Sequence, residues 1–215
     1  NQKYILNLDA DQVLDNNALS TMINELEQNN YVGIQASLKG VINETYWEKA
    51  MSYNVGLTNP EPKETRMIGT PALYKLEVLK RNNFNKLISG SCDDTDLCYR
   101  LVLNGFKLGV STAICFQKHR STFKTTYKKF LWYGEGDCEF AINHPERFWS
   151  IYTHPIRTYF FKKSILAVKK GDIKFVPFFM LTGLVRHIGF YKYSIKRALG
   201  IKSDSRVNNR NDLDF

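Results

Sequence analysis

Residues 4–116 alternate between short apolar runs that are typical of strands and longer amphipathic runs that are typical of helices. Tyr4–Leu8 is a short apolar run, and Tyr31–Ser37 alternates apolar residues with small or polar ones, which favours two strands. Between these runs, apolar residues recur at helical spacing from Ala18 to Leu26. Because strands and helices of this length alternate, the sequence predicts an α/β domain.

The same patterns predict the remaining elements of this part of the chain. Either Asn16 or Asn17 is placed to cap the helix that starts at Ala18, and Asn104-Gly105 ends a later helix. The predicted elements, in chain order, are a polar turn over Asp9–Asn16, a helix over Glu44–Leu57, a strand over Met67–Lys75, a helix that follows the Gly90–Asp94 turn, and a strand over Lys107–Phe116.

Positive charge is concentrated in the second half of the chain. Residues 118–210 hold 19 Lys and Arg against 6 Asp and Glu, whereas residues 1–117 hold 11 against 13. This asymmetry predicts an anionic partner for the second half, namely phosphate groups, lipid headgroups or nucleic acid. No nucleic-acid-binding motif accompanies the basic residues, so we expect phosphate or lipid rather than nucleic acid.

Aromatic and basic residues interleave along three predicted helices, over residues 122–142, 154–170 and 174–199. The longest apolar run, Phe175–Val185, has eleven residues, whereas a membrane span needs about 20. The sequence therefore predicts helices that either lie on a membrane surface or pack on the α/β domain. The predicted organisation is an α/β part over residues 1–121, a basic helical region over 122–200 and a polar tail over 201–215.

Two acidic clusters are candidates for chemistry. Asp9 and Asp11 directly follow the first predicted strand, and carboxylates at i and i+2 on such a loop can face one ligand. Their hard oxygens suit Mg²⁺ or Mn²⁺, which in turn binds a diphosphate. Turn-forming aspartates are the structural alternative.

The second cluster, Ser91–Asp96, opens a predicted helix. Ser91-x-x-Asp94 fits a capping box, and carboxylates in a first helical turn interact favourably with the helix dipole. Taken alone, this cluster favours a helix cap over catalysis.

Four stretches of the sequence together resemble family 2 glycosyltransferases of the GT-A fold. They are YILNLDADQVLDNNAL followed by VGIQ, then IGTPALYKLEVL, ISGSCDDTDLCYRLVLNGFKLGV and KHRSTFKTTYKKFLWYGEGD. The set combines a D-x-D after a strand, a D-D-x-D-L-x-x-R block and a downstream histidine, in that order. The likeness extends from Tyr4 to about Asp137. It implies a partial GT-A sheet, Rossmann-like with flanking helices, followed by a helical basic region.

The resemblance implies a role for each matching acid. Asp11, the second aspartate of D-x-D, would coordinate the divalent ion that bridges the donor diphosphate, and Asp9 would contact the donor ribose or assist the metal. Asp94 matches the general base that takes the proton from the acceptor hydroxyl. Asp93 would contact the acceptor, although the family usually has Glu at this position.

Further positions match donor and acceptor contacts of the family. His119 matches a position that contacts the metal or the diphosphate, and Arg120 would neutralise the diphosphate. Gly69 and Thr70 would line the donor-sugar pocket. Trp132 would stack on a sugar of the acceptor; a core tryptophan is the alternative for this residue.

The implied reaction is a single displacement with inversion, in which Mn²⁺ or Mg²⁺ stabilises the leaving nucleoside diphosphate. The implied partners are a nucleotide-sugar donor, a hydroxyl acceptor that is lipid-linked if the enzyme binds membranes, and an anionic membrane surface. The four cysteines lack C-x-x-C spacing, which favours a reducing compartment. We therefore expect a peripheral enzyme on the cytoplasmic face of a membrane.

Family members begin with a nucleotide-binding half that precedes the D-x-D strand, whereas this chain starts at that strand. We therefore expect the upstream half of the same protein as a further partner. The alternative enzyme is a haloacid-dehalogenase-like phosphatase, whose signature LNLDADQVL also fits, with Asp9 as nucleophile and Asp11 as acid and base. Against this alternative, the chain has Gly90-Ser91 where the acidic Mg²⁺-binding motif of those phosphatases has Gly-Asp. A third possibility is a non-enzymatic basic module that binds membrane or nucleic acid through residues 118–210.

Overall fold

The computed structural model describes residues 2–41, 44–58, 62–86, 88 and 91–201, and the chain divides into two compact units. The first, the sheet unit, comprises Asn1–Asn85 and Asp94–Ser121 and has a mixed α/β architecture. The second, the helical unit, comprises Lys86–Asp93 and the chain from Thr122 onward. The predicted polar tail, apart from Ile201, lies outside the described residues.

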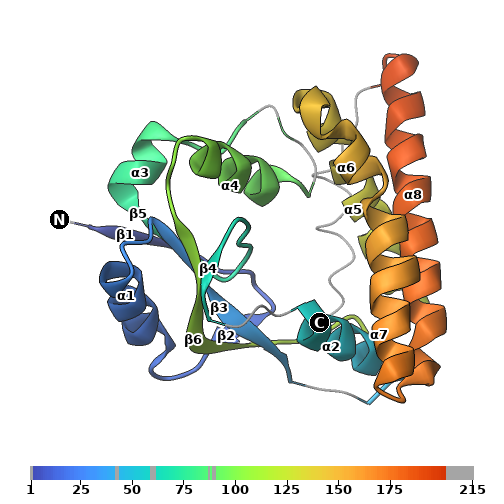
Figure 1. Cartoon of the computed structure of the whole chain (residues 1–215), viewed down its shortest axis with the longest axis horizontal. Coiled ribbons are helices and arrows are strands. Elements are labelled where there is room, and N and C mark those ends of the chain that lie inside the picture. Colours follow the sequence, from blue (N-terminus) through green and yellow to red (C-terminus); the bar gives the residue numbers. More distant parts are fainter. Residues whose placement is uncertain (1, 42–43, 59–61, 87, 89–90, 202–215) are drawn as a thin grey trace. The chain divides into compact units, whose positions relative to one another are not determined.

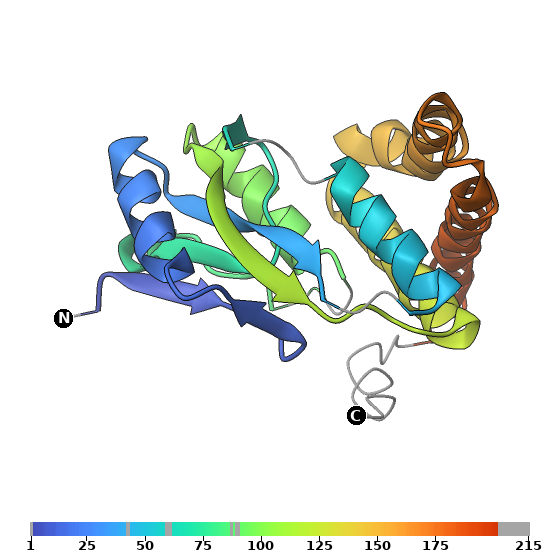
Figure 2. The same ribbon diagram turned by 90° about the horizontal axis from the view of Figure 1, so that it is seen from below.

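A curled, mixed sheet forms the centre of the sheet unit (Figures 1 and 2). Its strands lie in the order β1-β5-β3-β6-β2, and β4 pairs separately with β6. Only β3 and β6 are parallel among the described pairs. The strands are β1 (Tyr4–Asn7), β2 (Gln12–Leu14), β3 (Gly33–Gly40), β4 (Glu64–Thr65), β5 (Ala72–Lys75) and β6 (Leu108–Gln117).

Helices cover both faces of this sheet because its strands are apolar on both sides. On β5, Leu73 packs toward α1 (Ala18–Gln28), whereas its neighbours Ala72 and Tyr74 pack toward α3 (Leu76–Arg81) and α4 (Asp93–Leu103). The helix α2 (Tyr46–Thr58) follows β3.

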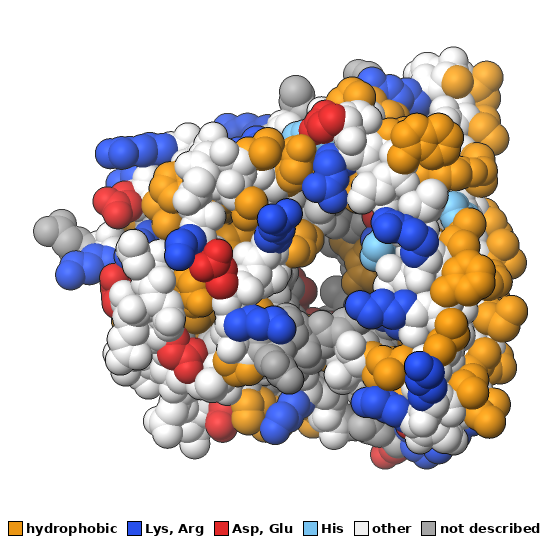
Figure 3. Space-filling view, viewed as in Figure 1, with side chains coloured by type: hydrophobic (Ala, Val, Ile, Leu, Met, Phe, Trp, Pro, Cys, Tyr) orange, Lys and Arg blue, Asp and Glu red, His pale blue; other side chains and the backbone are white. Residues whose placement is uncertain are grey.

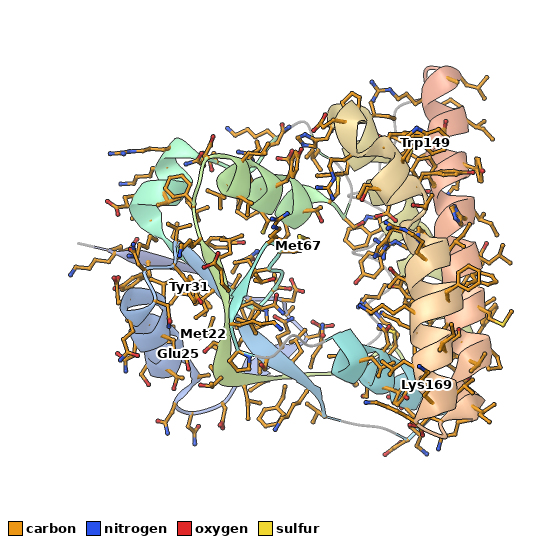
Figure 4. The ribbon with its side chains drawn as sticks, in the orientation of Figure 1. Met22, Glu25, Tyr31, Met67, Trp149 and Lys169 are labelled. Atoms are coloured by element: carbon orange, nitrogen blue, oxygen red, sulfur yellow. The ribbon has the colours of Figure 1, made fainter. Side chains whose placement is uncertain are left out.

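The contact between α1 and the sheet combines apolar packing with hydrogen bonds to the half-buried Glu25 carboxylate. Met22 and Tyr31 belong to one core cluster, and Figure 4 shows both side chains close to α1 and the strands. The Glu25 carboxylate on α1 accepts hydrogen bonds from the Ser111 hydroxyl at 2.5 Å and the Thr112 amide at 3.0 Å, both on β6. These bonds fix the position of α1 along β6.

The helical unit is built on a pair of long helices, α5 and α8. Glycines bring their backbones into contact, because a Cβ on Gly134 would lie 1.9 Å from the Arg186 carbonyl oxygen and one on Gly189 would lie 2.1 Å from that of Leu131. The described elements are α5 (Phe123–Asn143), η1 (Pro145–Arg147), α6 (Phe148–Tyr152), the π-helix η2 (Ile156–Lys163), α7 (Ser164–Lys169), η3 (Ile173–Phe175) and α8 (Val176–Ala198).

Most of the predicted elements are confirmed, with small shifts of their ends. The first strand, the helix from Ala18, the helix after Glu44 and the last strand correspond to β1, α1, α2 and β6. Asn17 is the residue before α1, but its side chain makes no capping bond. Gly105 has a φ of 78° and ends α4, as its position in the sequence predicts.

Two predicted elements were wrong in ways that matter for the site. The turn over Asp9–Asn16 contains the strand β2, which forms because Gln12–Leu14 pairs with the distant end of β6. The strand over Met67–Lys75 begins only at Ala72, because Pro71 lacks an amide hydrogen and cannot donate to a ladder. The predicted helix over residues 154–170 is a π-helix followed by the short α7. The short elements β4, α3 and α6 were missed.

Candidate functional site

Asp9 and Asp11 lie on the turn between β1 and β2, and Gln12 closes this turn. The Asp9 amide donates to the Gln12 side-chain oxygen at 3.1 Å, and the Gln12 amide donates to the Asp9 carbonyl at 3.1 Å. Gln12 is buried, and its side-chain amide donates to the Thr70 carbonyl at 3.2 Å. Gln12 therefore joins the turn to the segment that precedes β5.

Thr70 also contacts Asp9 directly. Its hydroxyl donates a hydrogen bond of 2.6 Å to one carboxylate oxygen of Asp9. A carboxylate accepts through two oxygens, so this bond orients the Asp9 side chain and still leaves it acceptor capacity.

The end of β6 positions Asp11. Gln12 and Gln117 face each other in the β2–β6 ladder, and the Lys118 amide donates to the Asp11 carbonyl at 3.1 Å. The Gln117 side-chain amide lies 3.3 and 3.4 Å from the two carboxylate oxygens of Asp11. Asp11 is half-buried and is held by a neutral donor rather than by a cation in these contacts.

Asp94 lies in the first turn of α4 and faces Gly69. A Cβ added to Gly69 would lie 3.8 Å from one Asp94 carboxylate oxygen. Gly69 itself is held by its amide, which donates to the Gln35 side-chain oxygen at 2.7 Å. The missing side chain of Gly69 thus leaves space beside the Asp94 carboxylate.

Cys98 connects α4 to this segment one helical turn after Asp94. Its thiol donates to the Ile68 carbonyl at 3.3 Å and accepts from the Ile68 amide at 3.5 Å. Burial raises the pKa of Cys98 to about 12, so the thiol keeps its proton and can donate. Because residues four apart share a helix face, the Cys98–Ile68 contact brings Asp94 next to Gly69.

The two acidic clusters of the sheet unit therefore meet at one dipeptide. Asp94 lies beside Gly69, and Asp9 is hydrogen-bonded to Thr70. Asp11 lies on the same turn as Asp9, and Gln12 links this turn to Thr70 by hydrogen bonds.

The other acids of the second cluster have different surroundings. Asp96 is only 1% exposed and forms an ion pair with the Arg100 side chain at 2.8 Å, so its role is structural. Asp93 is exposed and belongs to the helical unit. The Ser91 hydroxyl donates to the Trp132 carbonyl on α5 at 3.2 Å, which is a different bond from the predicted cap of α4.

His119 follows β6 and is buried against Gly40. A Cβ on Gly40 would lie 3.0 Å from the imidazole and 2.1 Å from the Ser52 hydroxyl of α2, so this glycine permits their close packing. Arg120 is half-buried on the next position of the chain. Trp132 lies on α5 in the helical unit, where its half-buried ring packs on Tyr133 at a centroid distance of 5.6 Å.

No group of three or more His, Cys, Asp or Glu side chains among the described residues is arranged to hold a metal ion. A preformed all-protein site that combines Asp11, His119 and a further acid is therefore not part of the described structure. Mg²⁺ is often bound by one or two carboxylates, with waters and substrate phosphates completing its shell. Asp9 and Asp11 fit a site of this kind, in which the protein supplies only two ligands, since both carboxylates lie on the turn between β1 and β2.

The sequence reasoning missed the residues that hold the acids in place, which are Gln12, Gln35, Cys98 and Gln117. Gln12 directly follows the D-x-D motif and Gln117 directly follows the last predicted strand, so their positions beside the motifs were the available signal. Nothing in the local sequence indicates that Cys98 contacts Ile68, because that contact depends on the packing of α4 on the sheet unit.

No protein-family model matches the chain, and no curated protein is significantly similar to it. The resemblance to family 2 glycosyltransferases therefore rests on the sequence motifs alone, and the activity of the chain is a matter for proposal.

Proposed function

We propose that this chain carries the metal-binding and acceptor-binding side of an inverting GT-A glycosyltransferase, which transfers a sugar from a nucleoside-diphosphate sugar to an acceptor hydroxyl. The observation that carries the proposal is the dipeptide Gly69-Thr70, with Asp94 beside its first residue and Asp9 bonded to its second. Displacement at a sugar carbon needs a base for the acceptor and stabilisation of the charge on the leaving group. Carboxylates from two distant segments supply both groups at one location.

On the leaving-group side, Asp9 and Asp11 would hold Mn²⁺ or Mg²⁺ together with the donor diphosphate. The bound ion supplies Lewis-acid stabilisation of the negative charge that develops on the diphosphate. The chain fixes the two carboxylates beforehand, since Thr70 orients Asp9 and Gln117 contacts Asp11. Arg120 would add positive charge near the diphosphate, because it lies two positions after Lys118, whose backbone amide donates to the Asp11 carbonyl.

On the acceptor side, Asp94 would accept the proton of the attacking hydroxyl. The backbone of Gly69 leaves space beside this carboxylate, and the Cys98–Ile68 contact holds α4 in position. Asp93, exposed at the start of α4, would contact the acceptor. A mixed sheet with helices on both faces is compatible with part of a GT-A domain, and the GT-A assignment is itself part of this proposal. Synthesis of a polysaccharide or glycolipid at the cytoplasmic membrane face fits such an enzyme.

The test is a transfer assay on the full natural protein with a panel of nucleotide sugars and Mn²⁺, in which Asp94→Asn is compared with the parent. We expect the substitution to lower transfer by about a thousandfold, because it removes the base, and to leave binding of nucleoside diphosphate nearly unchanged. Asp15→Asn, which makes the same charge change at an exposed position of the sheet unit, serves as the control and should keep parental turnover. Parental turnover by Asp94→Asn would overturn the assignment of the base.

A second assay on the same protein, hydrolysis of a generic phosphate ester, separates the proposal from phosphatase activity. Hydrolysis of a generic phosphate ester by the parent, lost in Asp9→Asn and unaccompanied by sugar transfer, would replace the glycosyltransferase proposal with the phosphatase alternative.

A further inference from the structure

The long helix α8 has two apolar faces, and only one of them is covered by the described residues. Its buried face includes Phe178, Phe179 and Phe190. The opposite face is exposed and apolar over most of the helix. Its members recur at steps of three or four residues and are each 43–69% exposed: Met180, Leu184, Ile188, Tyr191, Ile195 and Leu199.

This exposed row follows one side of the helix without a charged residue among its members. Steps of three and four residues keep side chains on one face of an α-helix, and the distance from Met180 to Leu199 along the helix axis is about 28 Å at a rise of about 1.5 Å per residue. Figure 3 shows the corresponding column of hydrophobic side chains along α8. Isolated exposed apolar residues are normal on proteins, but a contiguous row of this length marks a surface that meets an apolar partner.

The elements that pack on α8 extend the apolar surface. Phe161, Ile165 and Val168 are each 50–59% exposed and lie at helical spacing along η2 and α7. Trp149, on α6, is 73% exposed, more than any other large apolar side chain in the part of the chain that the structure describes. Figure 4 shows Trp149 and Lys169 near opposite ends of the helical unit, so an exposed aromatic group lies toward one end and an exposed cation toward the other.

Cations surround the apolar row. Residues 122–201 hold 14 Lys and Arg against 5 Asp and Glu. Several of these cations are exposed on the elements that carry the apolar residues, including Lys162, Lys169, Lys174 and Lys192. An apolar face bordered by Lys and Arg is the composition of helices that lie in the interface of an anionic membrane, where the stems of the cations cover apolar surface and their charged ends reach the headgroups.

The segment Ile173–Ala198 also has the length and hydropathy of a membrane span, with 44% of its most apolar window buried. Its charged contacts argue for a position in the membrane plane instead. Arg186, in the middle of α8, forms an ion pair with Asp137 on α5. Lys192, also on α8, forms an ion pair of 2.6 Å with Glu135 on α5. A spanning α8 would carry these ion pairs and the charged α5 into the hydrocarbon, which is unfavourable.

We propose that the row from Met180 to Leu199, with the exposed residues of η2 and α7, binds in the plane of an anionic lipid bilayer. The apolar side chains enter the boundary between headgroups and acyl chains, and the surrounding Lys and Arg contact lipid phosphates. This inference does not depend on the sugar-transfer proposal, because it uses only residues of the helical unit.

The test is co-sedimentation of the full natural protein with vesicles of phosphatidylcholine alone or mixed with phosphatidylglycerol. The decisive variant is Leu184→Gln/Ile188→Gln/Ile195→Gln, whose three positions are 43–59% exposed, so that its circular dichroism should match the parent. We expect binding to the anionic vesicles, salt-sensitive, and weakened at least about tenfold by this variant. The matched control, Val13→Gln/Leu103→Gln, changes apolar residues of the sheet unit that are 65% and 67% exposed and should bind like the parent.

Four results would overturn the inference. The first is equal vesicle binding by the α8 variant and the parent. The second is absence of parental binding to anionic vesicles. The third is parental protein that resists extraction by high salt and alkaline carbonate, which indicates a spanning helix. The fourth is a concentration-dependent dimer that the α8 variant abolishes while vesicle binding persists, which assigns this face to a second copy of the chain.

Discussion

The Thr70 hydroxyl is 2.6 Å from a carboxylate oxygen of Asp9, although 61 positions separate the two residues in the sequence. The contact joins the turn after β1 to the segment before β5. Gln12 reinforces it from the same turn by donating to the Thr70 carbonyl. One side of the candidate site therefore depends on Thr70 for the orientation of Asp9.

Thr70→Val keeps the shape of the side chain and removes this donor. We expect a loss of stability of about 1 kcal/mol or less, because the contact is exposed, and a several-fold loss of Mn²⁺-dependent affinity for nucleoside diphosphate. Calorimetric titration with UDP and GDP, with and without Mn²⁺, measures this effect. Thr70→Ser retains the hydroxyl and should bind like the parent. Equal affinities for Thr70→Val and Thr70→Ser would show that Asp9 needs no orientation by this bond.

Gly69 provides a separate test of the acceptor side. A Cβ at this position would lie 3.8 Å from Asp94, which is ordinary contact, so Gly69→Ala should change the free energy of unfolding by less than about 1 kcal/mol. Gly69→Leu carries a larger group into the space beside Asp94. We expect it to lower turnover about a hundredfold while nucleoside diphosphate affinity stays near the parental value.

The control for this experiment is Gly56→Leu, because a Cβ on Gly56 would have no neighbour within 4 Å. Steady-state kinetics with varied acceptor concentration distinguish the two variants. Full activity in Gly69→Leu would mean that the acceptor does not approach Asp94 past Gly69.

Local patterns predict the elements of the sheet unit well where one segment decides its own structure. The apolar run of β1 and the helical spacing of α1 are properties of contiguous residues, and both elements formed as expected. The strand β2 could not be predicted in this way, because Gln12–Leu14 becomes a strand only through pairing with β6 a hundred residues later. The same limit applies to the start of β5, where Pro71 interrupts an otherwise apolar run.

The candidate site likewise combines features that the local sequence predicts with contacts that depend on tertiary packing. The acids Asp9 and Asp94 are visible in the sequence as motifs, but their common contact with Gly69-Thr70 is a tertiary property. Cys98 illustrates the difficulty, since as a residue on the apolar face of a helix it is indistinguishable from ordinary core. Its contact with Ile68 exists only because α4 packs on that extended segment.

His154 predicts how the helical unit responds to acid. Burial, and then the positive charges of Arg186, Lys163 and Arg157, lower the pKa of His154 from 6.5 to about 3. Between these two pH values the unfolded chain binds more protons than the folded chain at this residue, so the free energy of unfolding falls as pH falls from about 6.5 to 3. The full contribution is on the order of 5 kcal/mol. Lys163, whose pKa burial lowers to about 7, titrates largely above this window.

Urea unfolding at about pH 7, 5.5 and 4 measures this dependence. His154→Gln cannot be protonated, so its stability should fall less steeply with acid than that of the parent. His144→Gln, the same substitution at the end of α5, is the matched control for loss of an imidazole elsewhere in the helical unit. Identical slopes for the parent and His154→Gln would contradict the burial of a neutral imidazole at this position.

The ion pair between Arg186 and Asp137 should be the most sensitive polar contact of the helical unit. The guanidinium binds both carboxylate oxygens, with one distance of 2.7 Å, and it also donates to the Tyr159 hydroxyl at 3.3 Å. The side chains of Arg186 and Asp137 are only 17% and 13% exposed. Asp137→Asn leaves a largely buried cation without its countercharge, and we expect it to lower the free energy of unfolding by about 3 kcal/mol.

Tryptophan fluorescence can report this loss from the helical unit alone. In a Trp47→Phe background, the remaining tryptophans, Trp132 and Trp149, both belong to that unit. The control lies in the same unit: Glu146→Gln changes a carboxylate whose side chain is 57% exposed, 3.7 Å from the His144 imidazole, and should change stability by less than about 1 kcal/mol. Asp137→Leu/Arg186→Met removes both charges and should recover part of the loss, because no buried charge is left unpaired. If Asp137→Asn costs no more than Glu146→Gln, the pair of Arg186 and Asp137 is solvated in solution and does not fix α8 against α5.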